Sequence, residues 1–195
     1  MANRFILNET SYFGAGAREN LVPELTGRGL KKVMFVTDKV LLECGVATKV
    51  TAELDKAGIA YEIYSDVKAN PTVANVQTGV AKFKEMGADS LVAVGGGSVM
   101  DTAKAVGIII ANPGFADVVS LEGVADTKNK SVPLIALPTT SGTAAEVTIN
   151  YVITDEANKK KMVCVDPKDI PVVAIVDSDL MMGMPKGLCA STGMD

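Results

Sequence analysis

The stretch SLVAVGGGSVMDTAKAVGIIIAN, Ser90–Asn112, decides the fold of this chain. It opens with the apolar run Leu91–Val94, which predicts a short buried strand. Three glycines and Ser98 follow this run. Apolar residues then recur at helical spacing, at Val99, Ala103, Val106 and Ile110. The order is therefore a strand, a glycine turn and a helix.

This glycine turn predicts a site for an anion. A strand–turn–helix unit directs backbone N–H groups and the positive end of the helix dipole at whatever lies above the turn. Because Gly95, Gly96 and Gly97 have no Cβ, a diphosphate can approach the backbone closely. The dinucleotide fingerprint would need glycine where Met100 stands, and the lysine of a P-loop is missing. A tight turn without a ligand is the alternative interpretation.

Asp101 follows the turn and is expected in the first turn of the helix. An acid at that position suits the helix dipole, so capping is one interpretation. The other is that Asp101 faces a bound cofactor or substrate. The pattern of residues leaves both interpretations open.

Composition limits the classes of function. The 195 residues are 48% hydrophobic and carry a net charge of −4, which argues against a nucleic-acid partner, since such proteins present a basic face. No apolar run approaches membrane-spanning length, so no membrane partner is expected. The N-terminal residues MANRFILNET lack the plan of a signal peptide.

The cysteines and histidines narrow the chemistry. Cys44, Cys164 and Cys189 are widely spaced and odd in number, which fits a reducing, cytoplasmic compartment and buried hydrophobic roles. The sequence has no histidine, so any histidine-dependent base or metal site must come from outside this chain.

The first 112 residues alternate between strands and helices. This alternation predicts an α/β fold, a Rossmann-like parallel sheet with helices on both faces. Two short extended pieces, Arg4–Leu7 and Ser11–Gly14, come first. Strands are expected at 32–37, 60–64 and 91–94, and helices at 18–28, 46–57 and 72–86. Ligands of such sheets bind at the carboxyl ends of the strands, where Asp38, Asn70 and Gly95–Ser98 fall.

The second part of the chain changes character. Ser131–Pro138 is expected to be a strand that leads into the hydroxyl-rich loop Thr139–Thr143, suited to phosphate or ribose oxygens or to an ordinary turn. Glu146–Thr154 and Lys160–Val165 predict an antiparallel hairpin, and Val172–Val176 a last buried strand. Residues 1–184 are expected to form one α/β domain, with residues 185–195 beginning another.

The motifs GGGSVMD (95–101), PTTSGTAAEVT (138–148) and STGMD (191–195), together with the hairpin, carry a family resemblance. The whole chain resembles the N-terminal half of the iron-dependent (group III) alcohol dehydrogenases. The resemblance implies a nucleotide-binding α/β domain followed by an all-helical domain that holds Fe(II). It also implies NAD-dependent interconversion of lactaldehyde and propane-1,2-diol, and a homodimer built through the N-terminal strands.

The resemblance implies roles for individual residues. Asp38 matches the acid that holds the adenine ribose and favours NAD over NADP, although it also suits a turn after a strand. Lys161 matches a residue that reaches a ribose hydroxyl, or is a solvated lysine of the hairpin. Asp195 matches the first of four metal ligands, the others being histidines. The full set of matched cofactor residues is Asp38, Asn70, Gly96, Gly97, Ser98, Asp101, Thr139, Thr140, Thr143, Thr148, Val152 and Lys161.

Two departures from the family pattern stand out. Val99 replaces a common proline, which only preorganises the turn. The sequence also stops at Asp195 without a helical domain, so we expect either a fragment of a longer enzyme or a truncated cofactor-binding unit. Three alternatives remain: a non-catalytic nucleotide-binding or dimerisation module, a glycerol dehydrogenase or dehydroquinate-synthase-like enzyme, and a phosphotransferase. The missing loop lysine counts against the last of these.

Overall fold

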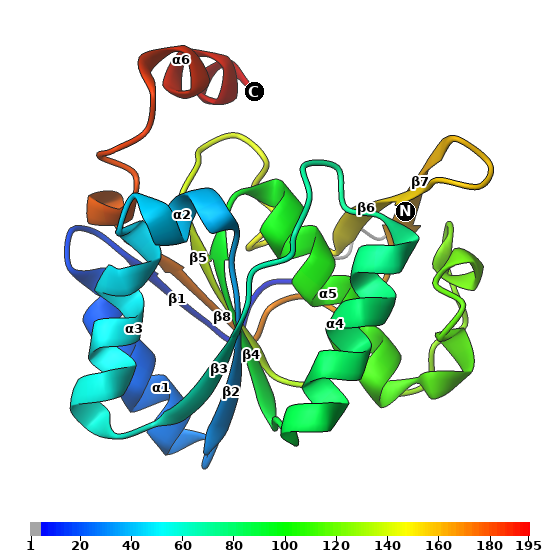
Figure 1. Ribbon diagram of the computed structural model, residues 1–195, viewed down its shortest axis with the longest axis horizontal. Helices are drawn as coiled ribbons and strands as arrows, with labels where there is room; N and C mark the ends of the chain where they lie inside the picture. Colours follow the sequence, from blue (N-terminus) through cyan, green and yellow to red (C-terminus); the bar gives the residue numbers. More distant parts are fainter. Residues whose placement is uncertain (1–4) are drawn as a thin grey trace.

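The structure is a computed structural model that describes residues 5–195. A six-stranded parallel sheet with the order β1-β8-β5-β4-β2-β3 forms its centre (Figure 1). An antiparallel hairpin, β6 and β7, lies beside the sheet. The predicted fold class is confirmed. The strands are β1 (Thr10–Phe13), β2 (Lys32–Val36), β3 (Ala60–Tyr64), β4 (Ser90–Gly95), β5 (Leu134–Pro138), β6 (Asn150–Asp155), β7 (Lys160–Val165) and β8 (Val173–Val176).

Helices cover both faces of the sheet, as Figure 1 shows. They are α1 (Leu21–Gly27), α2 (Lys39–Glu43), α3 (Val46–Ala57), α4 (Val73–Met86), α5 (Gly97–Ala111) and α6 (Lys186–Met194). Alternate residues of β4 enter two separate cores: Leu91 packs with α4, α5 and the hairpin, and Val92 packs with α1 and α3. Strand β4 is buried along its whole length. This explains why its sequence is apolar without alternation.

The helix ends follow the sequence signals. Thr72 forms a capping box with Asn75 at the start of α4. Gly58 and Gly87 end α3 and α4 with φ of 67° and 62°, in the left-handed region that glycine adopts without strain. These predicted boundaries are confirmed.

Several boundaries differ from the prediction. Residues 17–20 form a 3₁₀ turn and α1 begins only at Leu21, so that Pro23, which has no N–H, lies in its first turn. Strand β5 begins at Leu134 because Pro133 cannot donate to the ladder. Strand β6 begins at Asn150, since residues 145–147 before it form a turn in which the Val147 N–H donates to the Ala144 carbonyl.

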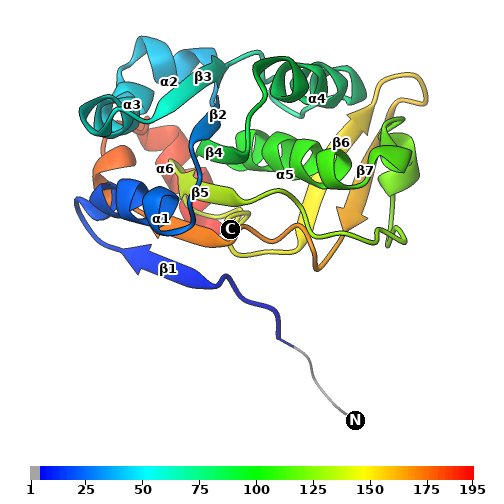
Figure 2. The ribbon, with the colours of Figure 1, turned by 90° about the horizontal axis from the view of Figure 1, so that it is seen from below.

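Of the two extended N-terminal pieces only the second forms a strand, and one short helix was not predicted. Of the extended piece 4–7, Arg4 lies outside the described residues, and residues 5–7 form no strand. The second piece is strand β1, which pairs in parallel with β8 and forms one edge of the sheet (Figure 2). Helix α2 was not predicted; it begins directly after Asp38, which caps it.

Candidate functional site

The carboxyl ends of the parallel strands bring most predicted site residues to one edge of the sheet. Asp38 follows β2, Gly96 follows β4, and Thr139 follows β5. These three strands are neighbours in the sheet. The chain runs outward from β2 to β3 and then returns to place β4 on the other side of β2, so the topological switch point lies between β2 and β4. Open parallel sheets bind ligands at this point.

The glycine turn at the start of α5 packs against the threonine loop 139–143. The Thr139 N–H donates to the Gly95 carbonyl at 3.0 Å. A Cβ on Gly96 would lie 3.1 Å from Thr140 Oγ1, and one on Gly97 would lie 3.0 Å from Thr143 Cγ2. No side chain caps the N-terminus of α5 within the described chain. Its first N–H groups are therefore available to an anion, and the turn fits a diphosphate.

Asn70, Ser98 and Lys161 meet although they come from three different elements. Lys161 Nζ donates to Asn70 Oδ1 at 2.8 Å, and the Asn70 N–H donates to Ser98 Oγ at 3.3 Å. All of these contacts are at exposed or half-buried positions. The arrangement places an ammonium and an amide beside the glycine turn, where ribose hydroxyls and phosphate oxygens find both donors and acceptors.

Asp38 stands between the end of β2 and α2. Its Oδ1 accepts from the Leu41 N–H at 2.9 Å and caps the helix. Asp38 therefore has a local structural role, but as the cap of a helix and not as a turn residue. The side chain is half-buried at the switch point, and its second carboxylate oxygen is compatible with a ribose hydroxyl there.

Asp101 is not in the first turn of α5, because the helix begins at Gly97 and Asp101 is its fifth residue. Its expected place in the first turn is wrong, and the capping interpretation falls with it. Burial raises the pKa of the Asp101 carboxyl to about 6, opposed by the backbone N–H of Val152 and by Lys104. Asp101 thus faces β6, next to a predicted site residue.

Lys104 was missed by the sequence analysis. It is fully buried, and its Nζ donates to the carbonyls of Thr148 and Asn150. Burial lowers the pKa of Lys104, while the carboxylates of Asp169, Asp101 and Glu146 act in the opposite direction. The sequence does contain a signal for this buried lysine, because Lys104 is the one charged residue between Asp101 and Asn112 in an apolar helix. Such a residue is almost always paired when buried.

Asp195 lies close to the threonine loop. A Cβ built on Gly142 would lie 3.2 Å from Asp195 Cβ, and Ser141 Oγ lies 3.3 Å from Thr192 Oγ1 of α6. Asp195 is exposed. Among residues 5–195 there is no group of three potential His, Cys, Asp or Glu metal ligands. The residues of this chain by themselves therefore do not fit an iron site.

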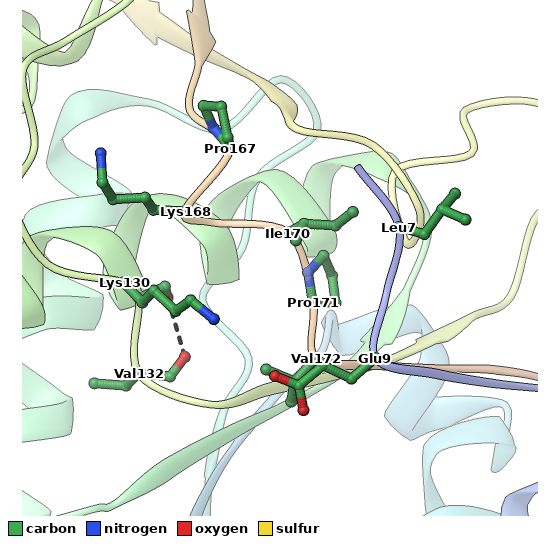
Figure 3. A pocket seen from close by; sticks show the side chains of 10 residues that line it. Leu7, Glu9, Lys130, Val132, Pro167, Lys168, Ile170, Pro171 and Val172 are labelled. Atoms are coloured by element: carbon green, nitrogen blue, oxygen red, sulfur yellow. Dashed lines mark hydrogen bonds between the residues drawn. The ribbon is translucent and has the colours of Figure 1, made fainter. Parts of the chain in front are cut away.

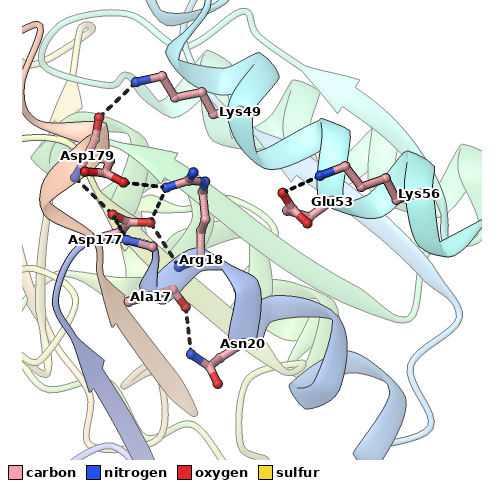
Figure 4. Close-up of polar contacts among 9 residues, drawn as sticks. Ala17, Arg18, Asn20, Lys49, Glu53, Lys56, Asp177 and Asp179 are labelled. Atoms are coloured by element: carbon pink, nitrogen blue, oxygen red, sulfur yellow. Dashed lines mark hydrogen bonds and ion pairs between the residues drawn. The ribbon is translucent and has the colours of Figure 1, made fainter.

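The carboxyl end of β8 is closed by an ion network instead of a ligand site (Figure 4). The buried carboxylate of Asp177 accepts from the backbone N–H groups of Gly16, Arg18 and Asp179 and from the Arg18 guanidinium at 2.8 Å. Burial acts to raise the pKa of Asp177, but these hydrogen bonds together lower it. The network fastens the turn after β1 to the end of β8.

A small cavity of about 90 Å³ lies at the opposite, amino end of β5 and β8 (Figure 3). Its lining includes Glu9, Lys130, Lys168 and Val172. It contains none of the predicted cofactor residues. The cavity is also too small for a dinucleotide, since ligand pockets usually exceed about 300 Å³. No helix of the described part of the chain is long and apolar enough to cross a membrane.

Comparisons with known proteins define the class to which this fold and site belong. The family model "Iron-containing alcohol dehydrogenase" matches residues 8–178. The chain is therefore a member of the iron-containing alcohol dehydrogenase family.

Individual relatives agree with this assignment. The chain is 58% identical to lactaldehyde reductase of Escherichia coli (strain K12) over all 195 residues, which cover 51% of the relative. The alcohol dehydrogenase from Oenococcus oeni superposes with a TM-score of 0.94 at 39% identity, over all of this chain and 51% of that one. Sulfoacetaldehyde reductase from Bifidobacterium kashiwanohense, in complex with NAD+, has a TM-score of 0.86 at 32% identity, with coverage of 100% and 51%. The chain spans about half the length of the relatives it matches.

Proposed function

We propose that this chain is the cofactor-binding part of an NAD-dependent dehydrogenase that interconverts lactaldehyde and propane-1,2-diol. The single observation that carries the proposal is the uncapped glycine turn at the switch point of the sheet, packed against the threonine loop. The 58% identity to a lactaldehyde reductase supports the choice of substrate.

In this proposal, different residues bind different parts of the cofactor. Gly96, Gly97 and Ser98 hold the diphosphate with backbone and hydroxyl donors. Asp38 accepts from the hydroxyls of the adenine ribose and repels a 2′-phosphate. The remaining contacts come from the cleft, the threonine loop and the hairpin, at Asn70, Asp101, Thr139, Thr140, Thr143, Thr148, Val152 and Lys161. Of these, Thr148, Val152 and Lys161 lie on the nicotinamide side.

The chemistry follows from this placement. Bound NADH supplies a hydride to the carbonyl carbon of an aldehyde, or NAD+ accepts one from the alcohol. The chain fixes the cofactor across the carboxyl edge of the sheet and so orients one face of the nicotinamide.

For residues 185–195 we propose the start of a second, helical domain, with residues 1–184 as the nucleotide-binding domain. In this proposal Asp195 is one ligand of an iron ion. The histidine ligands would have to come from beyond this 195-residue sequence, because it contains none.

We also propose a homodimer that forms along β1. This strand is an edge of the sheet, and Phe5, Leu7 and Phe13 on or just before it are largely exposed. An open edge with apolar side chains favours the addition of a strand from a second copy. Cys164 is buried, whereas Cys44 and Cys189 are exposed, so the expected buried role is wrong for these two. For the setting we propose a reducing cytoplasm, which suits exposed free thiols.

Titration calorimetry with NAD+ tests the proposed cofactor. We expect binding to the 195-residue chain, and at least about tenfold weaker binding by a Gly97→Ala variant, whose methyl group enters the turn. Gly114→Ala is the matched control, because a Cβ there meets nothing within 4 Å. Absence of heat with the unaltered chain would refute NAD binding.

A further inference from the structure

The free edge of strand β6 is closed by a lysine side chain and a single backbone carbonyl instead of a neighbouring strand. The other edge pairs with β7. On the free edge, the carbonyls of Thr148 and Asn150 accept from Lys104 Nζ at 2.5 and 2.9 Å. Further along, the Thr154 N–H donates to the Pro71 carbonyl at 2.7 Å. The backbone groups on this edge, which no strand pairs, therefore find separate hydrogen-bond partners.

Both charged contacts to this edge come from α5. Asp101 and Lys104 lie three residues apart, so they project from the same side of the helix. Asp101 faces the N–H of Val152, and Lys104 faces the two carbonyls before it. Helix α5 begins at the glycine turn. Helix α5 therefore fixes the position of the β6 edge relative to the glycine turn.

Lys104 differs from a solvated lysine in its burial and in its hydrogen bonds to backbone carbonyls. Its side chain is fully buried, with 0% of its surface exposed. Two carbonyls and, at 3.4 Å, Thr148 Oγ1 take its donors. Losing the ammonium would remove the partner that the Thr148 and Asn150 carbonyls share, so the backbone of these half-buried and exposed residues would be free to shift. The hairpin itself would remain, because Tyr151, Ile153 and Met162 are buried in the core against α5.

We propose that Lys104 is a positioning residue of the cofactor site. By holding the Thr148 and Asn150 carbonyls, it sets the place of Thr148 and Val152 relative to the glycine turn. This inference rests on the proposed function, in which Thr148 and Val152 lie on the nicotinamide side. Lys104 acts through these residues and does not itself touch the cofactor.

A comparison of two ligands tests the inference. ADP uses the Asp38 and glycine-turn contacts, whereas NAD+ also needs the hairpin. We expect Lys104→Met, which preserves the length of the side chain, to weaken NAD+ binding about tenfold and leave ADP binding within about twofold. Ile108→Val is the control, because it trims a fully buried side chain one turn later on the same helix. It should leave both affinities unchanged.

Hydrogen exchange on the ligand-free chain gives a second readout. The amides of residues 150–154 should exchange faster in Lys104→Met, while those of residues 99–103 in α5 should not. Lys104→Gln retains two N–H donors and should restore part of the NAD+ affinity; it also replaces the methionine variant if that variant does not fold.

The outcomes are separable. No NAD+ binding by the unaltered chain would refute the proposed function, and hydrogen exchange alone would then decide the role of Lys104. Equal losses for NAD+ and ADP, or no loss for either, would overturn the positioning role. So would failure of both lysine variants to fold, because a purely architectural role would then be sufficient.

Discussion

Asp38 serves the fold and the proposed cofactor with different oxygens. Oδ1 caps α2 through the Leu41 N–H. We expect Asp38→Gly to raise the affinity for NADP+ about tenfold, since the repulsion of a 2′-phosphate disappears, and to lower that for NAD+. The fold should survive, because glycine at an N-cap costs only a few tenths of a kcal/mol.

Calorimetric titrations of both cofactors check this prediction. Asp126→Ala is the control, because it removes the same charge from an exposed side chain before β5. Equal affinity for NADP+ before and after the change at Asp38 would contradict it.

Asp101 makes stability depend on pH. Burial raises its folded-state pKa from 3.8 to about 6. A group with a raised pKa contributes stability that is present below pH 3.8 and is lost as the pH rises through about 6. In Asp101→Asn the amide oxygen still accepts the Val152 N–H but does not titrate. Relative to this variant, the unaltered chain should lose about 2 kcal/mol of unfolding free energy across that range. Urea unfolding at several pH values measures the unfolding free energy of both proteins. If the two free energies change with pH in the same way, the raised pKa of Asp101 is disproved.

Among the elements, the joint between β1 and β8 depends on one carboxylate. Asp177 is buried and satisfies three backbone N–H groups and Arg18. We expect Asp177→Ala to cost about 3–5 kcal/mol, because it leaves three backbone N–H donors without a partner and the half-buried guanidinium of Arg18 with Asp179 alone. Asp179→Ala is the milder control, since that side chain is 42% exposed. Urea unfolding measures both, and similar losses would argue against the special role of Asp177.

Elements whose residues act locally could be predicted from the sequence. The apolar runs of β2 and β4 and the glycines that end α3 and α4 determine structure over a few residues, so these elements are where we expected them. Partners that lie far apart in the sequence were missed, because local signals carry no information about them. Asp38 reads as a turn residue until α2 is seen behind it, and Lys104 finds its carbonyls 44 and 46 positions away.

For the whole molecule, the open edge of β1 predicts association. The Thr10 N–H bonds to the Val172 carbonyl just before β8, and the Gly14 N–H bonds to the Val176 carbonyl of β8. The Ser11 N–H therefore points to the free edge. Ser11→Pro removes a donor from that edge and leaves the pairing with β8 intact. We expect the unaltered chain to be a dimer and Ser11→Pro to shift it to a monomer, as measured by light scattering. Thr10→Pro, which breaks a bond to β8, is the destabilised control. A monomeric unaltered chain at all concentrations would exclude this dimer.

The 195-residue chain made by itself should bind NADH without turning over. It offers only Asp195 as a match to the family's iron ligands, and this side chain is exposed. A single solvated carboxylate is a poor site for a first-row metal. With Fe(II), NADH and lactaldehyde, absorbance at the NADH band should not fall. Iron-dependent oxidation of NADH, in a preparation free of any longer relative, would contradict this expectation.

The pairing of β1 with β8 has a consequence for synthesis on the ribosome. Thr10 lies opposite Val173, so the first strand of this sheet to leave the ribosome pairs with the last strand of the same sheet. At roughly 5–20 residues per second, the N-terminal segment waits many seconds for its neighbour. Strands β2 to β5 pair with one another meanwhile. A nascent chain halted before Val173 should therefore hold a formed four-stranded sheet while β1 is still open to proteases and chaperones.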